Sequence, residues 1–206
     1  MSCREKSKLE MIRVKSGKNR EEMAEYVSRK CSLKCTKNMI KDYEEKTTPV
    51  SVKVLIAYAE LGNCLPSWIL EEGNMETEVR NMYFVELDLA KEEVYRYDVE
   101  TLISEALKKY RKEKKLSCIT LGRKMYVDVS TISKYENAKA EKKINIEYLI
   151  SVIFPAIGKS IDDLDEFLVK EEYKELFSAI REEGKTITNY IRLSLKKIKK
   201  IHRRNF

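Results

Sequence analysis

The chain carries the same pattern of residues twice, and an internal repeat constrains the architecture before any single motif does. In both copies an arginine precedes a polar helix-capping residue, an apolar residue followed by a small one, a further apolar residue and a closing Tyr-Glu. The second copy reads Arg111, Ser117, Leu121-Gly122, Ile132 and Tyr135-Glu136-Asn137. The first copy reads Arg13, Asn19, Met23-Ala24, Ile40 and Tyr43-Glu44, with about six extra residues near 28–33.

Short helices are expected throughout both copies. The chain has only 6 Gly and 3 Pro in 206 residues, which disfavours turn-rich β structure. Polar residues that suit helix N-caps stand before apolar stripes with helical spacing. We predict five helices per copy; Asn19, Thr36, Ser51, Ser117, Asp128 and Asn145 are the expected N-caps. Asn19 and Glu22 form an expected capping box, which opens a helix from Arg20 to about Ser28.

The predicted fold class is mostly α, with two five-helix domains, a connector and a helical C-terminal extension. The predicted boundaries are 1–70, 71–98, 99–168 and 169–206. The connector is acidic, and apolar residues alternate with acidic ones around Val85–Leu89 before Val94–Tyr97, which favours a β-hairpin over a helix. An amphipathic helix is expected over Glu171–Glu183, and a last helix is expected to start at Thr186; residues 185–206 contain no acidic residue.

Composition excludes several classes of protein. A net charge of +7 and a sequence pI near 9.0 allow an acidic partner such as nucleic acid. The five cysteines are scattered without a CxxC pair, and the single histidine, His202, lies near the end, so we expect no metal site and no cofactor. We expect no enzymatic activity, because there is no Gly-rich phosphate loop and the carboxylates are dispersed. Reduced thiols and the absence of a long apolar run predict a cytoplasmic protein without a membrane partner.

The repeated unit resembles the lambda-repressor/Cro-like helix-turn-helix family, often called the XRE type. The second copy matches its motif without a gap, and the first departs from it by the extra residues between helices two and three. The resemblance implies two tandem domains of this type. It also implies an ion pair that ties helix one to the end of helix three, formed by Arg13 and Glu44 in the first copy and by Arg111 and Glu136 in the second.

The family places the start of helix three in the major groove of duplex DNA. Carried over to this chain, the implied base-reading residues are Lys37, Asn38 and Lys41 in the first copy. In the second copy they are Asp128, Val129, Ser130, Ser133 and Lys134. The implied phosphate contacts come from the starts of helix two and from the segments after helix three: Asn19, Arg20, Lys46, Thr47, Ser117, Cys118, Lys139, Lys142 and Lys143.

Two residues of the second copy depart from the family pattern. Tyr126 stands where the turn usually has glycine, so a left-handed backbone there would be strained. Asp128, at the start of helix three, would repel a phosphate. The second copy therefore either reads bases or serves as a scaffold that dimerises or docks.

The resemblance implies a sequence-specific transcription regulator that binds double-stranded DNA, of a kind frequent in phages, plasmids and toxin–antitoxin loci. The two domains would then act as a built-in pseudo-dimer, and the C-terminal helices offer a place for a homodimer. The alternative is a protein-interaction adaptor, or an antitoxin-like module, that retains the fold.

Overall fold

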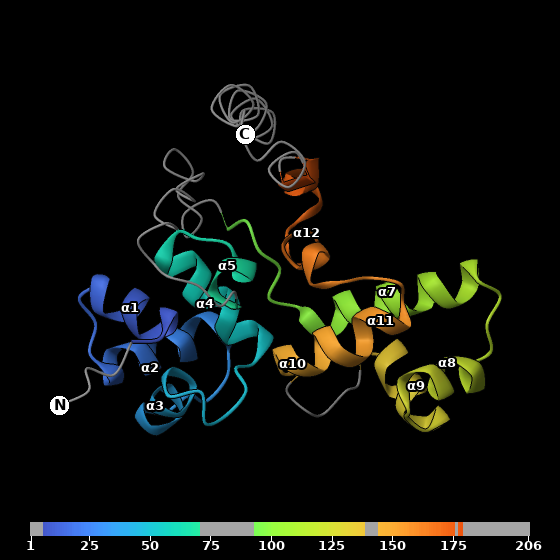
Figure 1. The fold of residues 1–206 in the computed structure, drawn as a ribbon, viewed down its shortest axis with the longest axis horizontal. Coiled ribbons are helices and arrows are strands. Elements are labelled where there is room, and N and C mark those ends of the chain that lie inside the picture. The colour runs from blue at the N-terminus through green and yellow to red at the C-terminus, as the bar shows by residue number, and fades with distance from the viewer. Residues whose placement is uncertain (1–5, 71–92, 139–143, 176, 179–206) are drawn as a thin grey trace.

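The computed structural model describes residues 6–70, 93–138, 144–175 and 177–178, which fold almost entirely as helices (Figure 1). The first half, residues 6–70, contains α1 (Lys8–Lys15), α2 (Arg20–Cys31), α3 (Lys37–Glu44), α4 (Val52–Gly62) and α5 (Pro66–Leu70). The second half, residues 93–178, begins with α7 (Val99–Glu113), α8 (Cys118–Met125), α9 (Val129–Glu136) and α10 (Ile146–Tyr148). It continues with η2 (Leu149–Ile153), α11 (Phe154–Ala156), η3 (Ile161–Asp163), α12 (Leu164–Leu168) and η4 (Glu171–Tyr173). The predicted fold class, mostly α, is confirmed.

Side-chain caps fix the start of most helices. The predicted capping box is present, because Asn19 Oδ1 accepts from the Glu22 N–H at 3.0 Å and the Glu22 carboxylate accepts from the Asn19 N–H at 2.8 Å. The predicted side-chain caps of four further helices are also confirmed: Thr36, Ser51, Ser117 and Asn145. The prediction for Asp128 is wrong in one respect. This residue is the N-cap of α9, but its side chain makes no capping hydrogen bond.

Two helices differ from their expected form. The second helix was expected to end near Ser28, but α2 continues to Cys31, so part of the extra sequence lengthens the helix. In the second half, residues 149–153 form a π-helical turn, and the Phe154 N–H bonds to the Leu149 carbonyl five residues back. Pro155 accounts for this widening, because proline lacks an N–H and its ring clashes with the carbonyl four residues earlier in an α-helix.

The two halves repeat not only the helix order but also the turns. A residue with positive φ, a conformation that side chains disfavour, follows each of the first four helices in both halves, where α10, η2 and α11 count as one continuous fourth helix of the second half. The pairs are Gly17 and Lys115, Ser32 and Tyr126, Lys46 and Ala138, and Asn63 and Gly158. Tyr126 adopts φ 55° and ψ 40°, so it takes the left-handed conformation although it is not glycine.

The buried side chains of both halves form one hydrophobic cluster. Its centre is α4, where all six residues from Val54 to Ala59 are 0% exposed. A helix that is apolar on every side must be covered on every side. α1, α2 and α5 cover it from the first half.

The halves meet through a reciprocal pair of backbone hydrogen bonds. The Val52 N–H donates to the Ile144 carbonyl at 3.1 Å, and the Ile146 N–H donates to the Val50 carbonyl at 3.0 Å. They flank an antiparallel bridge between Ser51 and Asn145, the N-caps of the fourth helix of each half. Relative to the two N-caps, Val50 corresponds to Ile144 and Val52 to Ile146. A rotation that exchanges the two halves therefore converts each hydrogen bond into the other, as expected for two halves related by a two-fold axis. We call this contact the junction.

A second contact joins equivalent residues of the two halves. Ser67 is the second residue of α5 and Asp165 the second residue of α12. The Ser67 N–H donates to Asp165 Oδ1 at 2.9 Å, and the Ser67 hydroxyl donates to Oδ2 at 2.5 Å. A residue that meets its own counterpart lies on a two-fold axis. Lys53 and Glu100 add an ion pair of 2.9 Å between the halves.

The expected hairpin falls largely outside the described residues. Its first arm, Val85–Leu89, is not among them, and no strand occurs within the part that is described. On the second arm, Tyr95 forms an isolated antiparallel bridge with Val169, and the Lys170 N–H donates to the Val94 carbonyl at 2.9 Å. This segment therefore packs against the chain that follows α12.

Most of the predicted C-terminal extension also lies outside the described residues. The described part begins with η4, and Phe177 packs edge-on against the buried ring of Tyr95 at a centroid distance of 6.0 Å. The predicted domain boundaries remain predictions. In the described residues, no helix has the length and apolar character needed to cross a membrane.

Candidate nucleic-acid interface

In the second half, α8 and α9 cross closely because residue 122 is glycine. A Cβ on Gly122 would lie 2.7 Å from the Val127 carbonyl oxygen, in a backbone segment that cannot easily move. The Val127 N–H in turn donates to the Gly122 carbonyl at 2.9 Å and closes the turn. The small residue expected at the crossing is therefore required by the turn between the helices, as well as by the helices themselves.

In the first half, Ala24 occupies the equivalent position and is buried without being glycine. The longer α2 moves the closing turn further along the chain, where the Leu33 N–H bonds to the Ser28 carbonyl at 3.3 Å. The Ser28 hydroxyl also accepts from the Cys35 N–H at 3.0 Å and holds the loop against α2. The extra residues thus keep the turn away from Ala24.

Both ion pairs implied by the resemblance are present. Arg13 binds Glu44 through two hydrogen bonds, Nε to Oε1 at 2.5 Å and Nη2 to Oε2 at 3.2 Å. Arg111 binds Glu136 in the same way, with distances of 2.6 and 2.9 Å. Each pair anchors the end of helix three to helix one, so it fixes the direction in which that helix points.

The second pair makes stability depend on pH in the acid range. The hydrogen bond from Arg111 lowers the pKa of Glu136 below its ordinary value of 4.5. A lowered carboxyl pKa stabilises the folded state fully above the ordinary value, and this contribution is lost as the pH falls through the lowered one. We expect the difference in unfolding free energy between wild type and Glu136→Gln to be constant near neutral pH and to shrink below about pH 4.5. Urea unfolding from about pH 7 to about pH 3 measures it; a difference that grows in acid would contradict it.

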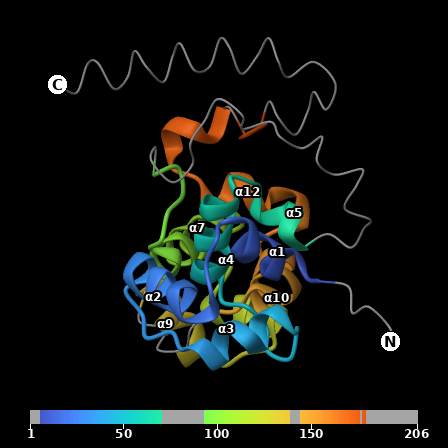
Figure 2. The ribbon, with the colours of Figure 1, turned by 90° about the vertical axis from the view of Figure 1, so that its left-hand side faces the viewer.

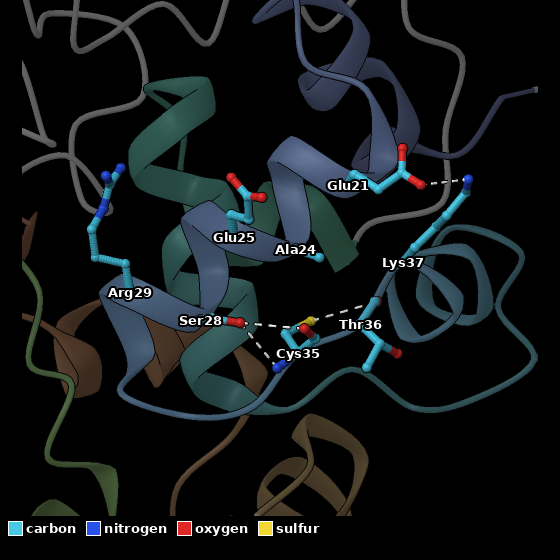
Figure 3. A pocket seen from close by; sticks show the side chains of 8 residues that line it. All are labelled: Glu21, Ala24, Glu25, Ser28, Arg29, Cys35, Thr36 and Lys37. Carbon is cyan, nitrogen blue, oxygen red and sulfur yellow. Dashed lines mark hydrogen bonds and ion pairs between the residues drawn. The ribbon is translucent and has the colours of Figure 1, made fainter.

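The predicted base-reading residues of the first half all lie on α3 and are exposed: Lys37, Asn38 and Lys41. A shallow groove of about 600 Å³ separates this helix from α2 (Figure 3). Across it, Lys37 Nζ contacts Glu21 Oε1 at 2.8 Å. Both side chains are more than half exposed, 57% and 63%, so releasing Lys37 to another partner costs little.

The predicted readers of the second half are exposed on α9: Val129, Ser130, Ser133 and Lys134. An equivalent groove of about 640 Å³ lies between α8 and α9, and Arg123 and Thr131 line it. Sequence reasoning did not single out these two residues. Arg123 directly follows Gly122 at the crossing, and Thr131 directly precedes the core residue Ile132, which was the available signal. Apolar side chains are also exposed on α8, in the turn and at the start of α9: Ile119 at 54%, Tyr126 at 95% and Val129 at 43%.

The predicted phosphate contacts fall into three groups. Asn19, Lys46, Thr47 and Ser117 are exposed, and Cys118 is half-buried. Arg20 is half-buried, and its Nε already donates to Glu44 Oε2 at 2.9 Å, so it belongs to the ion pair of the first half. Lys139, Lys142 and Lys143 lie outside the described residues.

The two helix-two starts differ electrostatically. The first turn of α2 contains Glu21 and Glu22, and the Glu22 carboxylate already occupies the helix start through the capping box. The first turn of α8 has no acidic residue, and Ser117 caps it with a neutral hydroxyl. The partial positive charge of a helix N-terminus favours an anion. The start of α8 is therefore the better place for a phosphate.

The helices α3 and α9 lie on the same side of the molecule, along its lower edge in both views (Figures 1 and 2). They belong to different halves, and the junction lies between these halves. The residues predicted to contact bases in the two halves therefore lie on the same side of the molecule. In the part of the chain that the structure describes, no group of three His, Cys, Asp or Glu side chains is placed to hold a metal ion.

Comparison with known proteins finds a similarity for part of the second half. A family model described as a helix-turn-helix (HTH_3) matches residues 107–152, which span the end of α7, α8, α9, α10 and most of η2. This segment is thus similar to a DNA-binding regulator family, and such a domain suggests DNA binding. A search of curated proteins and a search of solved structures gave no match.

Proposed function

We propose that the chain is a transcription regulator that binds a specific site on duplex DNA through both halves at once. One observation carries the proposal: a two-fold junction joins the halves and leaves α3 and α9 on one side. Dimeric helix-turn-helix proteins insert two such helices into successive major grooves, about one helical turn (~34 Å) apart. Here a single chain would supply both helices.

The proposal requires that residues 8–70 form a second domain of the same kind. Three features of the first half support this: the order of its helices, the left-handed residue after each of its first four helices, and the Arg13–Glu44 ion pair at the place of Arg111–Glu136. The turns and the ion pairs depend on side chains and backbone at specific positions. Simple helical packing would not reproduce them.

Exposed positive charge on the face of α3 supports contact with DNA. Lys37 and Lys41 lie on the helix and Lys46 follows it, each with an exposed side chain. Lysine can donate to guanine, and Asn38 can pair with adenine through two hydrogen bonds. Because phosphates dominate the affinity, binding should weaken steeply as salt increases.

A second function is favoured by the surface of the second half. Exposed Ile119, Tyr126 and Val129 on α8, in the turn and at the start of α9, next to Asp128, resemble a protein-docking surface more than a phosphate-binding one. In this alternative the chain acts as an adaptor. A complex formed there would tolerate salt, whereas a DNA complex would not.

Selection of binding sites from randomised duplex DNA tests the proposal with the full-length chain. We expect an enriched motif that covers two successive major grooves on one face of the duplex, with affinity that falls as salt is raised. Shuffled DNA of the same composition is the control. Weak binding without an enriched motif would contradict the proposal and favour the adaptor.

A further inference from the structure

We propose that one chain recognises a composite DNA site, made of two half-sites that are inverted in direction but unlike in sequence. This inference rests on the proposed function and specifies its substrate. A symmetric dimer of identical subunits needs a palindrome, because its two reading helices are identical. This chain has a two-fold backbone relation between two helices whose exposed side chains differ.

The direction of the half-sites follows from the junction. The bonds from Val52 to Ile144 and from Ile146 to Val50 exchange with each other when the halves are exchanged. Ser67 and Asp165 meet as equivalent residues of α5 and α12. Both contacts are isologous, which a head-to-tail arrangement would not give. The helices α3 and α9 are thus related by a rotation, and the base sequences they read run in opposite directions.

The sequence of the half-sites differs because the equivalent readers differ. Aligning the core residues Ile40 and Ile132 pairs Lys37 with Val129, Asn38 with Ser130, and Lys41 with Ser133. All six side chains are exposed. Lysine favours guanine and asparagine favours adenine, whereas valine contacts the thymine methyl group and serine accepts several bases. None of the three positions has the same chemistry in both halves.

The two half-sites also differ in how strongly they are held. The first half has two lysines on its reading helix, Lys37 and Lys41, whereas the second half has one, Lys134. The second half places Asp128 directly before its reading helix, where the first half has the neutral Thr36. The half-site under α3 should therefore be the stronger and more strictly defined one.

The spacing between the half-sites is fixed by the same contacts. The junction, the Ser67–Asp165 contact and the Lys53–Glu100 ion pair all join the halves, and their buried side chains share one hydrophobic cluster. A rigid pair of reading helices cannot follow a half-site that is rotated around the duplex. About five inserted base pairs, roughly half a helical turn, would place one half-site on the far side.

The test compares four duplexes built from the selected motif, all bound by the full-length chain. They are the composite site, a palindrome of the α3 half-site, a palindrome of the α9 half-site, and the composite site with about five base pairs inserted between its halves. Fluorescence anisotropy gives the affinities, and analytical ultracentrifugation gives the number of chains on each duplex. We expect one chain on the composite site and affinity at least about tenfold lower for the other three.

Variants assign each half-site to its helix. The selection is repeated with Asn38→Ala and, as the matched control, with Ser130→Ala at the equivalent exposed position. Asn38→Ala should relax base preference in one half of the motif, and Ser130→Ala in the other half. A palindromic motif, or two chains bound to a palindrome as tightly as one to the composite site, would overturn this inference and leave sequence-specific DNA binding intact. Absence of any motif would overturn both.

Discussion

Replacing Glu44 by alanine is expected to lower the free energy of unfolding by about 3–5 kcal/mol, the cost of removing one partner from a buried ion pair. The Glu44 side chain is 0% exposed and accepts hydrogen bonds from both Arg13 and Arg20. Without it, the guanidinium of Arg13, whose side chain is only 10% exposed, loses its counter-ion inside the protein. Urea unfolding followed by circular dichroism measures the change.

The second half provides the matched control for this prediction. Glu136 binds only one arginine among the described residues, and the Arg111 side chain is 24% exposed, so water can screen the stranded charge. Glu136→Ala should therefore lower the free energy of unfolding clearly less than Glu44→Ala does. Glu44→Gln keeps one acceptor oxygen, so its free energy of unfolding should lie between those of wild type and Glu44→Ala. An equal decrease in the free energy of unfolding for the two alanine variants would show that the deeper burial of the Arg13–Glu44 pair adds nothing to its effect on stability.

The combined variant Lys37→Ala/Asn38→Ala/Lys41→Ala is expected to reduce affinity for the selected site by at least about 100-fold. Each good base contact contributes about 1–3 kcal/mol of discrimination. All three side chains are exposed, so the fold should remain intact. Binding to unrelated DNA should fall much less, because part of it rests on phosphate contacts elsewhere. Affinity measured on selected and shuffled duplexes separates the two effects.

A charge-matched control accompanies this variant. Lys6→Ala/Lys15→Ala removes the same number of positive charges from exposed positions outside α3. It should lower affinity for selected and shuffled DNA by similar, small factors. If the control lost as much discrimination as the α3 variant, α3 would not be the reading helix of the first half.

Local features of this protein were readable from the sequence. The starts of α2, α3, α4, α8 and α10 are set by single side chains that cap the helix next to them. A cap and the N–H group that it bonds are only three or four residues apart, so caps can be predicted from the sequence alone. The two arginine–glutamate pairs were accessible only through the resemblance to a family, because the partners in each pair are far apart in the chain.

Other local predictions were wrong for identifiable reasons. The carboxylate of Asp128 has the right chemistry for a cap but makes no capping hydrogen bond. The end of α2 was placed too early, since nothing between Ser28 and Cys31 stops a helix. The phosphate contact of Arg20 stays a prediction, but the buried Glu44 already binds this side chain, an interaction that depends on how α2 and α3 pack.

The sequence by itself determined the helices and most of their caps, because these depend on side chains close together in the chain. Only the tertiary structure decided how the halves are joined. The junction is formed by backbone N–H and carbonyl groups of Val50, Val52, Ile144 and Ile146, which every residue type except proline can supply. A contact made by groups common to nearly all residues leaves no trace in a sequence pattern, although it sets the orientation of α3 relative to α9.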